Sequence, residues 1–126
     1  MTNQINVENV VIIGTCAIYN CTPHDLNIVR KNGTILTVKP SGIVPRCASI
    51  EEQVGIIGDS NTGIEITQQQ LGEVTDLPDP EPGTRYIVSR MVANAATNRD
   101  DLLVPGSLIR NDQGQVVGCK GLTKVK

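Results

Sequence analysis

The most constraining feature of this chain is that its hydrophobic core must be built almost without aromatic rings. Its 126 residues include 14 Val, 14 Ile and 8 Leu, but two Tyr and no Phe or Trp. These aliphatic residues suffice to fill one small core, so we predict a single domain over residues 1–126, with the polar residues 1–9 as a flexible arm. The two rings, Tyr19 and Tyr86, are too few for a platform that stacks the bases of single-stranded nucleic acid.

The charge balance and hydropathy pattern exclude further classes of partner. Eleven Lys and Arg against 13 Asp and Glu give a net charge of −2, so no overall positive field attracts a DNA or RNA polymer. The longest apolar run, residues 10–13, is far shorter than the ~20 residues that span a membrane. The first residues carry no export signal. We therefore predict a cytoplasmic protein that acts away from membranes.

Four cysteines and one histidine limit the possible chemistry. Without an export signal, the thiols of Cys16, Cys21, Cys47 and Cys119 are expected to be reduced. Three of them could join His24 in a zinc set, but the spacing lacks the Cys-x-x-Cys pair of structural zinc sites, so we predict no metal site. A nucleophile pair of Cys21 and His24 lacks a third group to orient it, and a structural turn is the simpler interpretation. We predict no catalytic residue and no cofactor.

Two β-hairpins are the clearest secondary-structure predictions. β-branched residues alternate with polar ones over residues 26–38, around the Asn-Gly pair that is typical of tight hairpin turns. A second hairpin is predicted over residues 108–119. The proline-rich residues 76–83 predict a surface loop. Further extended segments are predicted at 10–13, 17–19, 43–47 and 84–89.

One helix is predicted over residues 90–98, where Ser89 is a suitable N-cap and the alanine content favours helix. The signal is weaker between residues 48 and 82, where residues 49–52 could cap one further short helical turn. The predicted fold class is therefore α+β: a mainly antiparallel sheet with one clear helix and at most a second short one.

A cluster of Arg and Asn residues forms the candidate binding site. Arg90 opens the predicted helix, where unpaired backbone N–H groups and a partial positive charge favour anions. Asn94 and Asn98 lie on the same helical face, with Arg99 just beyond. Arg110 lies at the tip of the second hairpin. Guanidinium forks suit phosphate, and amides suit ribose or adenine.

The competing interpretation of these arginines is structural. Arg90, Arg99 and Arg110 could instead pair at the surface with the nearby aspartates at positions 100, 101 and 112. Surface pairs of this kind are common in proteins, and composition alone favours them over a binding site. Both interpretations stay open at this point.

Three segments carry a resemblance to a known family. They are AIYNCTPHDLNIV (residues 17–29), YIVSRMVANAATNRDDLLVPG (residues 86–106) and LIRNDQGQVVGC (residues 108–119). Together they resemble the first-described Thoeris anti-defence family of phages and prophages. The resemblance covers about half of the chain and leaves residues 48–82 largely outside it.

The resemblance implies a signal sponge rather than an enzyme. Such proteins bind the cyclic ADP-ribose isomers made by bacterial TIR-domain immune proteins and hold them uncleaved, so that the Thoeris effector stays inactive. It also implies a homo-oligomer, dimeric or higher, that holds a glycocyclic ADP-ribose type of signal at an interface. Some members also hold cyclic oligonucleotides at separate sites. The implied location is the cytoplasm of the infected bacterial host.

Seven residues are expected to bind the ligand on this basis: Tyr86, Arg90, Met91, Asn94, Asn98, Arg99 and Arg110. The arginines would contact phosphate or ribose hydroxyls, the asparagines ribose or adenine, and Met91 or Tyr86 the base. Two other functions stay open. A structural or protein-binding phage accessory protein could use the aliphatic hairpin at 26–38 as an interface. A cyclic-nucleotide-degrading enzyme is disfavoured by the lone histidine.

Overall fold

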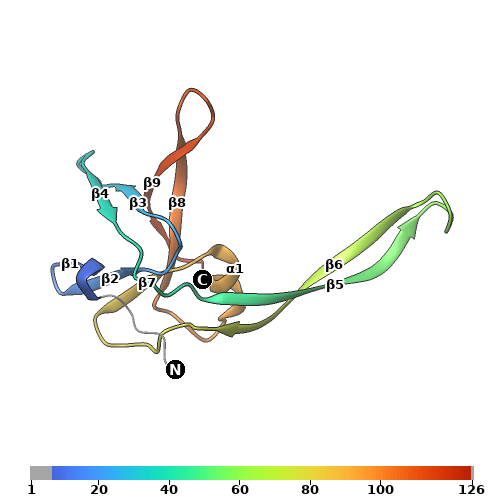
Figure 1. Ribbon diagram of the computed structural model, residues 1–126, viewed down its shortest axis with the longest axis horizontal. Coiled ribbons are helices and arrows are strands. Elements are labelled where there is room, and N and C mark those ends of the chain that lie inside the picture. Colours follow the sequence, from blue (N-terminus) through green and yellow to red (C-terminus); the bar gives the residue numbers. More distant parts are fainter. Residues whose placement is uncertain (1–6, 126) are drawn as a thin grey trace.

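The computed structural model describes residues 7–125, which consist mostly of β-strands (Figure 1). The elements run in the order 3-10 helix Val7–Asn9, β1 Val11–Ile13, β2 Cys16–Asn20, β3 Leu26–Val29, β4 Ile35–Val38, β5 Arg46–Ile57, β6 Ile64–Thr75, β7 Thr84–Ile87, α1 Arg90–Ala95, β8 Leu102–Arg110 and β9 Val116–Thr123. The predicted α+β class is wrong, because the one α-helix among the described residues is six residues long.

Seven strands form one sheet in the order β1-β2-β7-β8-β9-β3-β4, which curves into a nearly closed barrel. The neighbours β1–β2, β3–β4 and β8–β9 are antiparallel. The neighbours β2–β7, β7–β8 and β3–β9 are parallel. The sheet is therefore mixed rather than mainly antiparallel, and we call these seven strands together with α1 the body.

Asn20, at the end of β2, ties the two ends of the sheet together. It bridges to Pro40 just beyond β4, and its carbonyl accepts the N–H of Ser41 at 2.8 Å. Its fully buried side chain donates to the carbonyls of His24 and Val38 at 2.7 and 2.9 Å. The same amide accepts the N–H and hydroxyl of Thr22 at 2.9 and 2.6 Å. This turn was predicted to be structural, and Asn20 is its centre.

Strand β7 separates two apolar clusters, because successive side chains of a strand point to opposite faces. Tyr86 and Val88 pack on one side with the buried face of α1. Ile87, between them, packs on the other side with Ile28 and other residues inside the barrel. The aliphatic composition thus supplies two small cores rather than one.

The helix α1 begins as predicted but ends three residues early. The Ser89 hydroxyl accepts the N–H of Val92 at 3.3 Å, which makes Ser89 the N-cap. Ala96 is the C-cap, and the chain then folds back so that the N–H of Arg99 reaches the Ala96 carbonyl at 3.2 Å. Asn98 therefore lies in a turn beyond the helix and not on its face.

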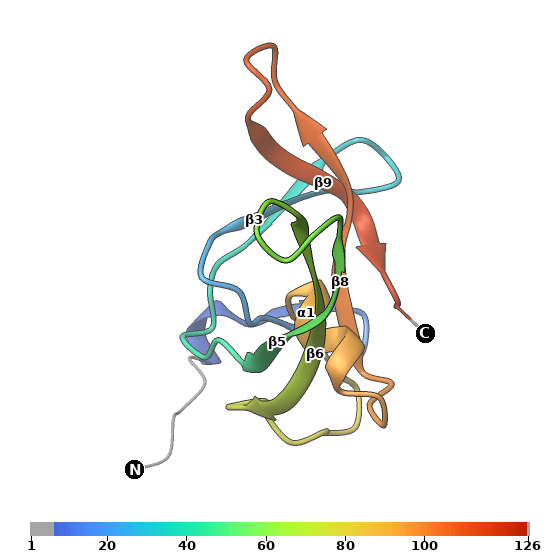
Figure 2. The same ribbon diagram turned by 90° about the vertical axis from the view of Figure 1, so that its right-hand side faces the viewer.

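The long strands β5 and β6 form a two-stranded ribbon that projects from the body (Figures 1 and 2). At its base, Cys47 and Val74 pack against the core beside α1. We call residues 49–73, outward from that base, the arm. The predicted helical turn at 49–52 is wrong, because these residues belong to β5 and pair across the ribbon with β6.

Several local predictions are confirmed. The hairpin at 26–38 is β3–β4, and the hairpin at 108–119 forms the outer part of β8–β9. The proline-rich segment at 76–83 contains no strand or helix. The predicted flexible arm over residues 1–9 lies mostly outside the described residues, although Asn9 donates its amide to the Pro40 carbonyl at 2.8 Å. No helix of the described part is long and apolar enough to cross a membrane.

Candidate functional site

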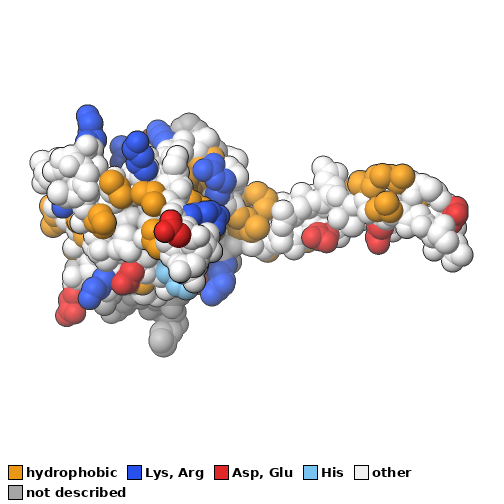
Figure 3. Space-filling view, turned by 90° about the horizontal axis from the view of Figure 1, so that it is seen from above, with side chains coloured by type: hydrophobic (Ala, Val, Ile, Leu, Met, Phe, Trp, Pro, Cys, Tyr) orange, Lys and Arg blue, Asp and Glu red, His pale blue; other side chains and the backbone are white. Residues whose placement is uncertain are grey.

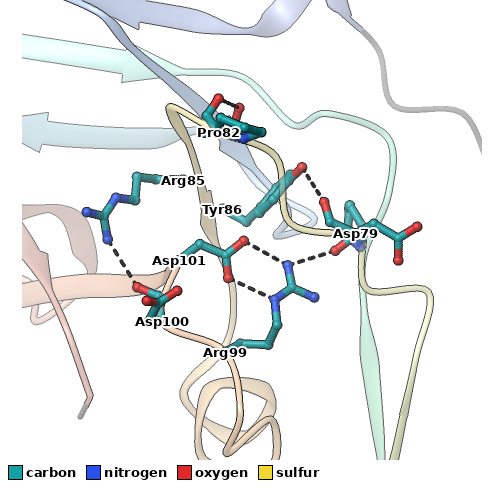
Figure 4. A network of polar contacts seen from close by, with 9 residues as sticks. Asp79, Pro82, Arg85, Tyr86, Arg99, Asp100 and Asp101 are labelled. Carbon is teal, nitrogen blue, oxygen red and sulfur yellow. Dashed lines mark hydrogen bonds and ion pairs between the residues drawn. The ribbon is translucent and has the colours of Figure 1, made fainter.

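Arg99 lies in a network of polar contacts that fastens the proline-rich loop to the body (Figure 4). Its Nε and Nη2 donate to the two carboxylate oxygens of Asp101 at 2.8 Å each. Nη2 also donates to the Pro78 carbonyl at 2.8 Å. The hydrogen bonds from Arg99 hold the pKa of Asp101 below its ordinary value. The guanidinium of Arg99 is thus occupied within the chain, as the structural interpretation of the arginines requires.

Tyr86 belongs to the same network. Its hydroxyl donates to the Asp79 carbonyl at 3.0 Å, and its ring stacks on Tyr19 with a centroid separation of 5.8 Å. The residue is 4% exposed. Both aromatic rings of the chain therefore pack on each other, and the Tyr86 ring presents no open face to a base. Arg85 also contacts this region, through the Asp100 carbonyl at 3.1 Å.

Arg90, Met91 and Asn94 remain together on the exposed side of α1. Beside them lies a pocket of about 330 Å³ between the start of α1, the turn after β2 and the base of the arm. We call it the α1 pocket. Its lining residues are Cys21, Thr22, Pro23, Val44, Pro45, Arg46, Cys47, Ser89, Met91 and Val92.

The chemistry of the α1 pocket is mixed. It has a cation in Arg46, hydroxyls in Thr22 and Ser89, and a polarisable thioether in Met91. Neither Arg46 nor Arg90 has a side-chain hydrogen bond or ion pair with another described residue, so both cations are free to take an anion. The contribution of Arg46 was missed from the sequence, because it lies 44 positions before Arg90.

Arg110 lies away from this pocket within one copy of the chain. It ends β8, and its Nη1 donates to the Gly114 carbonyl at 2.9 Å inside the hairpin turn. Figures 1 and 2 show the tip of β8–β9 projecting to the far side of the body from α1. Of the seven predicted ligand residues, the structure brings Arg90, Met91 and Asn94 together and leaves Arg110 apart.

A second, larger hollow lies between β1, β2, β3, β4 and β9, at the gap in the barrel. This cleft has a volume of about 650 Å³ and contains none of the predicted ligand residues. Its apolar walls are Ile13, Ile18, Ile28, Val29, Leu36 and Leu122, and its cations are Arg30, Lys31 and Lys120. The adjacent cations at the first hairpin turn are the one sequence signal that could have pointed to it.

The cysteines form no disulfide in the described part of the chain: Cys21 and Cys119 are buried, and Cys16 and Cys47 are half-buried. Burial raises the pKa of the Cys21 thiol, although its hydrogen bond with Ser41 opposes the rise. Over residues 7–125, no group of three or more His, Cys, Asp and Glu side chains is arranged to hold a metal ion.

Comparison with known proteins gives a limited similarity. Uroplakin-2 of Sus scrofa is 30% identical over 91 residues, which are 72% of this chain and 47% of that protein. Uroplakin-2 of Bos taurus is 29% identical over 90 residues, 71% of this chain and 46% of that protein. The chain thus spans about half the length of the curated relatives it matches. No family model and no solved structure matches it.

Proposed function

We propose that the protein sequesters a small cyclic nucleotide, of the TIR-derived cyclic ADP-ribose kind, and holds it without cleaving it. The observation that carries the proposal is the α1 pocket, where Arg46 and the neighbouring Arg90 have no carboxylate partner among the described residues. Free guanidinium groups bind phosphate through paired hydrogen bonds, and Met91 suits the face of a base. In this role the protein would block activation of a Thoeris effector, as the family resemblance implies.

The size of the α1 pocket favours a site that a second copy completes. Its volume of about 330 Å³ is near the lower end of the ~300–1,000 Å³ typical of ligand pockets. Arg110 is exposed on a hairpin tip that cannot reach Arg90 within one copy. We therefore propose that Arg90 and Asn94 of one copy and Arg110 of another face the same ligand, at an interface of the homo-oligomer.

Binding is tested by incubating the purified protein with cyclic ADP-ribose made by a TIR enzyme. We expect the nucleotide to be depleted from solution and released intact by heat denaturation. Arg46→Ala and Arg90→Ala should each abolish capture without lowering the melting temperature by more than a few degrees. Lys39→Ala, which changes an exposed cation outside both the α1 pocket and the cleft, is the matched control. Cleaved product, or capture that survives both changes, contradicts the proposal.

The shared interface is tested by combining two variants, each of which lacks one of the two arginines. Arg90→Ala and Arg110→Ala copies should each capture nothing alone. A dimer that contains one copy of each retains one intact site, formed by Arg90 of the second variant and Arg110 of the first. Purified through two different tags, such a mixed dimer should recover about half of the wild-type capacity. Recovery of none would place both arginines in a site within one copy.

The binding experiment also distinguishes nucleotide sequestration from the alternative function, that of a structural or protein-binding phage component. A protein that captures no cyclic nucleotide but assembles with one phage or host protein would support that alternative instead.

A further inference from the structure

The arm has a different charge from the rest of the molecule. Residues 47–84 contain no Lys or Arg, so all 11 cations of the chain lie outside the arm. Five acids lie on the arm: Glu51, Glu52, Asp59, Glu65 and Glu73. The remainder of the chain has 11 cations and eight acids. The arm is thus strongly negative and the remainder is positive, and the two are electrostatically complementary.

One face of the arm is aliphatic in its outer half. Residues that pair directly across an antiparallel ribbon lie on the same face. The pairs Ile50–Gln70, Glu52–Gln68, Gly55–Ile66 and Ile57–Ile64 lie on one face once the bulge between Gln53 and Gly55 is taken into account. The aliphatic part of this face is therefore its outer half, beyond Glu52. Exposure of the four isoleucines ranges from 41% to 66%, and Figure 3 shows apolar side chains gathered near the outer end of the arm.

Such a ribbon needs a covering partner. An isolated two-stranded hairpin is marginally stable in water, and a long apolar strand surface with free edges invites association. Two arms packed on each other would bring ten acids together without a cation between them. Charge repulsion therefore disfavours an arm-to-arm contact and favours a positively charged apolar surface.

The cleft at the barrel gap is such a surface. Its walls are aliphatic, and Arg30, Lys31 and Lys120 line it without a side-chain hydrogen bond or ion pair to any other residue between 7 and 125. The arm projects from one side of the body, whereas the strands around the cleft lie on the other (Figure 1). The arm of a copy therefore points away from its own cleft and could occupy the cleft of a neighbour.

We propose that the arm of one copy docks into the cleft of a second copy. The aliphatic face near the tip, with Ile57 and Ile64, lies against the apolar walls, and Asp59, in the loop between β5 and β6, lies near the three cations. Because arm and cleft lie on opposite sides of one copy, the contact is head-to-tail. Contacts of this kind build rings or chains rather than a two-fold dimer.

The contact is tested by sedimentation velocity at micromolar concentration without nucleotide, so that the result does not depend on the proposed function. Wild type should assemble, and raising the salt concentration should weaken the assembly. The arm variant Ile57→Asp/Ile64→Asp should raise the dissociation constant at least about 100-fold. Ile56→Asp, on the opposite face of the arm, is the matched control and should assemble like wild type. Circular dichroism checks that each variant remains folded.

A mixing experiment distinguishes this contact from any other. Without nucleotide, which joins the Arg90 and Arg110 sides of the other proposed interface, the cleft variant Lys31→Glu/Lys120→Glu should also be monomeric alone. Mixed with the arm variant, it supplies an intact arm to an intact cleft, and the pair should stop at a one-to-one dimer. The proposal is overturned if wild type is monomeric, if the cleft variant assembles like wild type, or if the mixture remains monomeric.

Discussion

Removing the guanidinium of Arg99 should lower the stability of the fold, because the largely buried carboxylate of Asp101 would lose its partner. The two side chains are 13% and 10% exposed and share two hydrogen bonds of 2.8 Å. We predict that Arg99→Ala lowers the free energy of unfolding substantially at pH 7.

The expected magnitude follows from the burial of the pair. Breaking a buried ion pair costs roughly 3–5 kcal/mol, because the remaining charge stays unpaired. Both side chains retain some contact with water, so we expect the lower end, about 3 kcal/mol. For a chain of this length, that corresponds to a fall in melting temperature of about 10 °C. Arg99→Lys keeps the charge but loses the planar fork, and should fall between wild type and Arg99→Ala.

The loss should depend on pH with a definite sign. Arg99 holds the pKa of Asp101 below its ordinary value in the folded protein. The stabilisation is therefore complete above the ordinary carboxyl pKa and is lost as the pH falls through the lower folded-state pKa. Urea denaturation at pH 7 and at pH 3 should show that the free energies of unfolding of wild type and Arg99→Ala differ less at pH 3 than at pH 7.

A different result would refute this account of Arg99. If Arg99→Ala costs less than about 1 kcal/mol and its stability keeps the pH dependence of wild type, the pair does not stabilise the fold. If nucleotide capture were then lost, Arg99 would belong to the ligand site, as the family resemblance implies. Tyr86, in contact with the same loop, would then need the same test.

Two further predictions concern buried polar groups. Asn20→Ala removes a fully buried amide with four hydrogen bonds and leaves the carbonyls of His24 and Val38 without their donor. Urea denaturation should show that the free energy of unfolding falls by about 3 kcal/mol or more. A fall below about 1 kcal/mol would contradict the central role of Asn20. Burial raises the pKa of the Cys21 thiol. At neutral pH it should therefore react with a thiol reagent at least about ten times more slowly than the half-buried Cys16, measured in variants that each keep one cysteine. Equal rates would show that Cys21 is accessible.

The hairpins were predictable because their information is local. Around Asn32 and Gly33 the turn residues and the alternation of strand residues occur in one short window, and the structure confirms them. The arm was not predictable in this way. Its strands contain two bulges and two glycines, and the adjacent Ile56 and Ile57 interrupt a simple alternation.

The sheet order and the candidate site depend on contacts that no short window contains. The parallel pairing of β2 with β7 joins residues more than 60 positions apart. Whether Arg99 is free or occupied depends on Asp101 and on the Pro78 carbonyl, which a loop places beside it. Likewise, Arg46 reaches the α1 pocket because the base of the arm packs on the helix.

The parallel pairings also decide when the body can fold. Strand β2 cannot complete its parallel pairing until β7 has been synthesised. Likewise, β3 cannot pair with β9 until Cys119, the partner of Ile28, has been synthesised. Contacts of such long sequence separation form slowly, because the loop must close before they stabilise it. On the ribosome, the β3–β4 hairpin can form early, but the barrel stays open until β9 has emerged. During that interval the aliphatic strands are exposed, and this protein should depend on rapid completion of the β8–β9 hairpin to avoid aggregation.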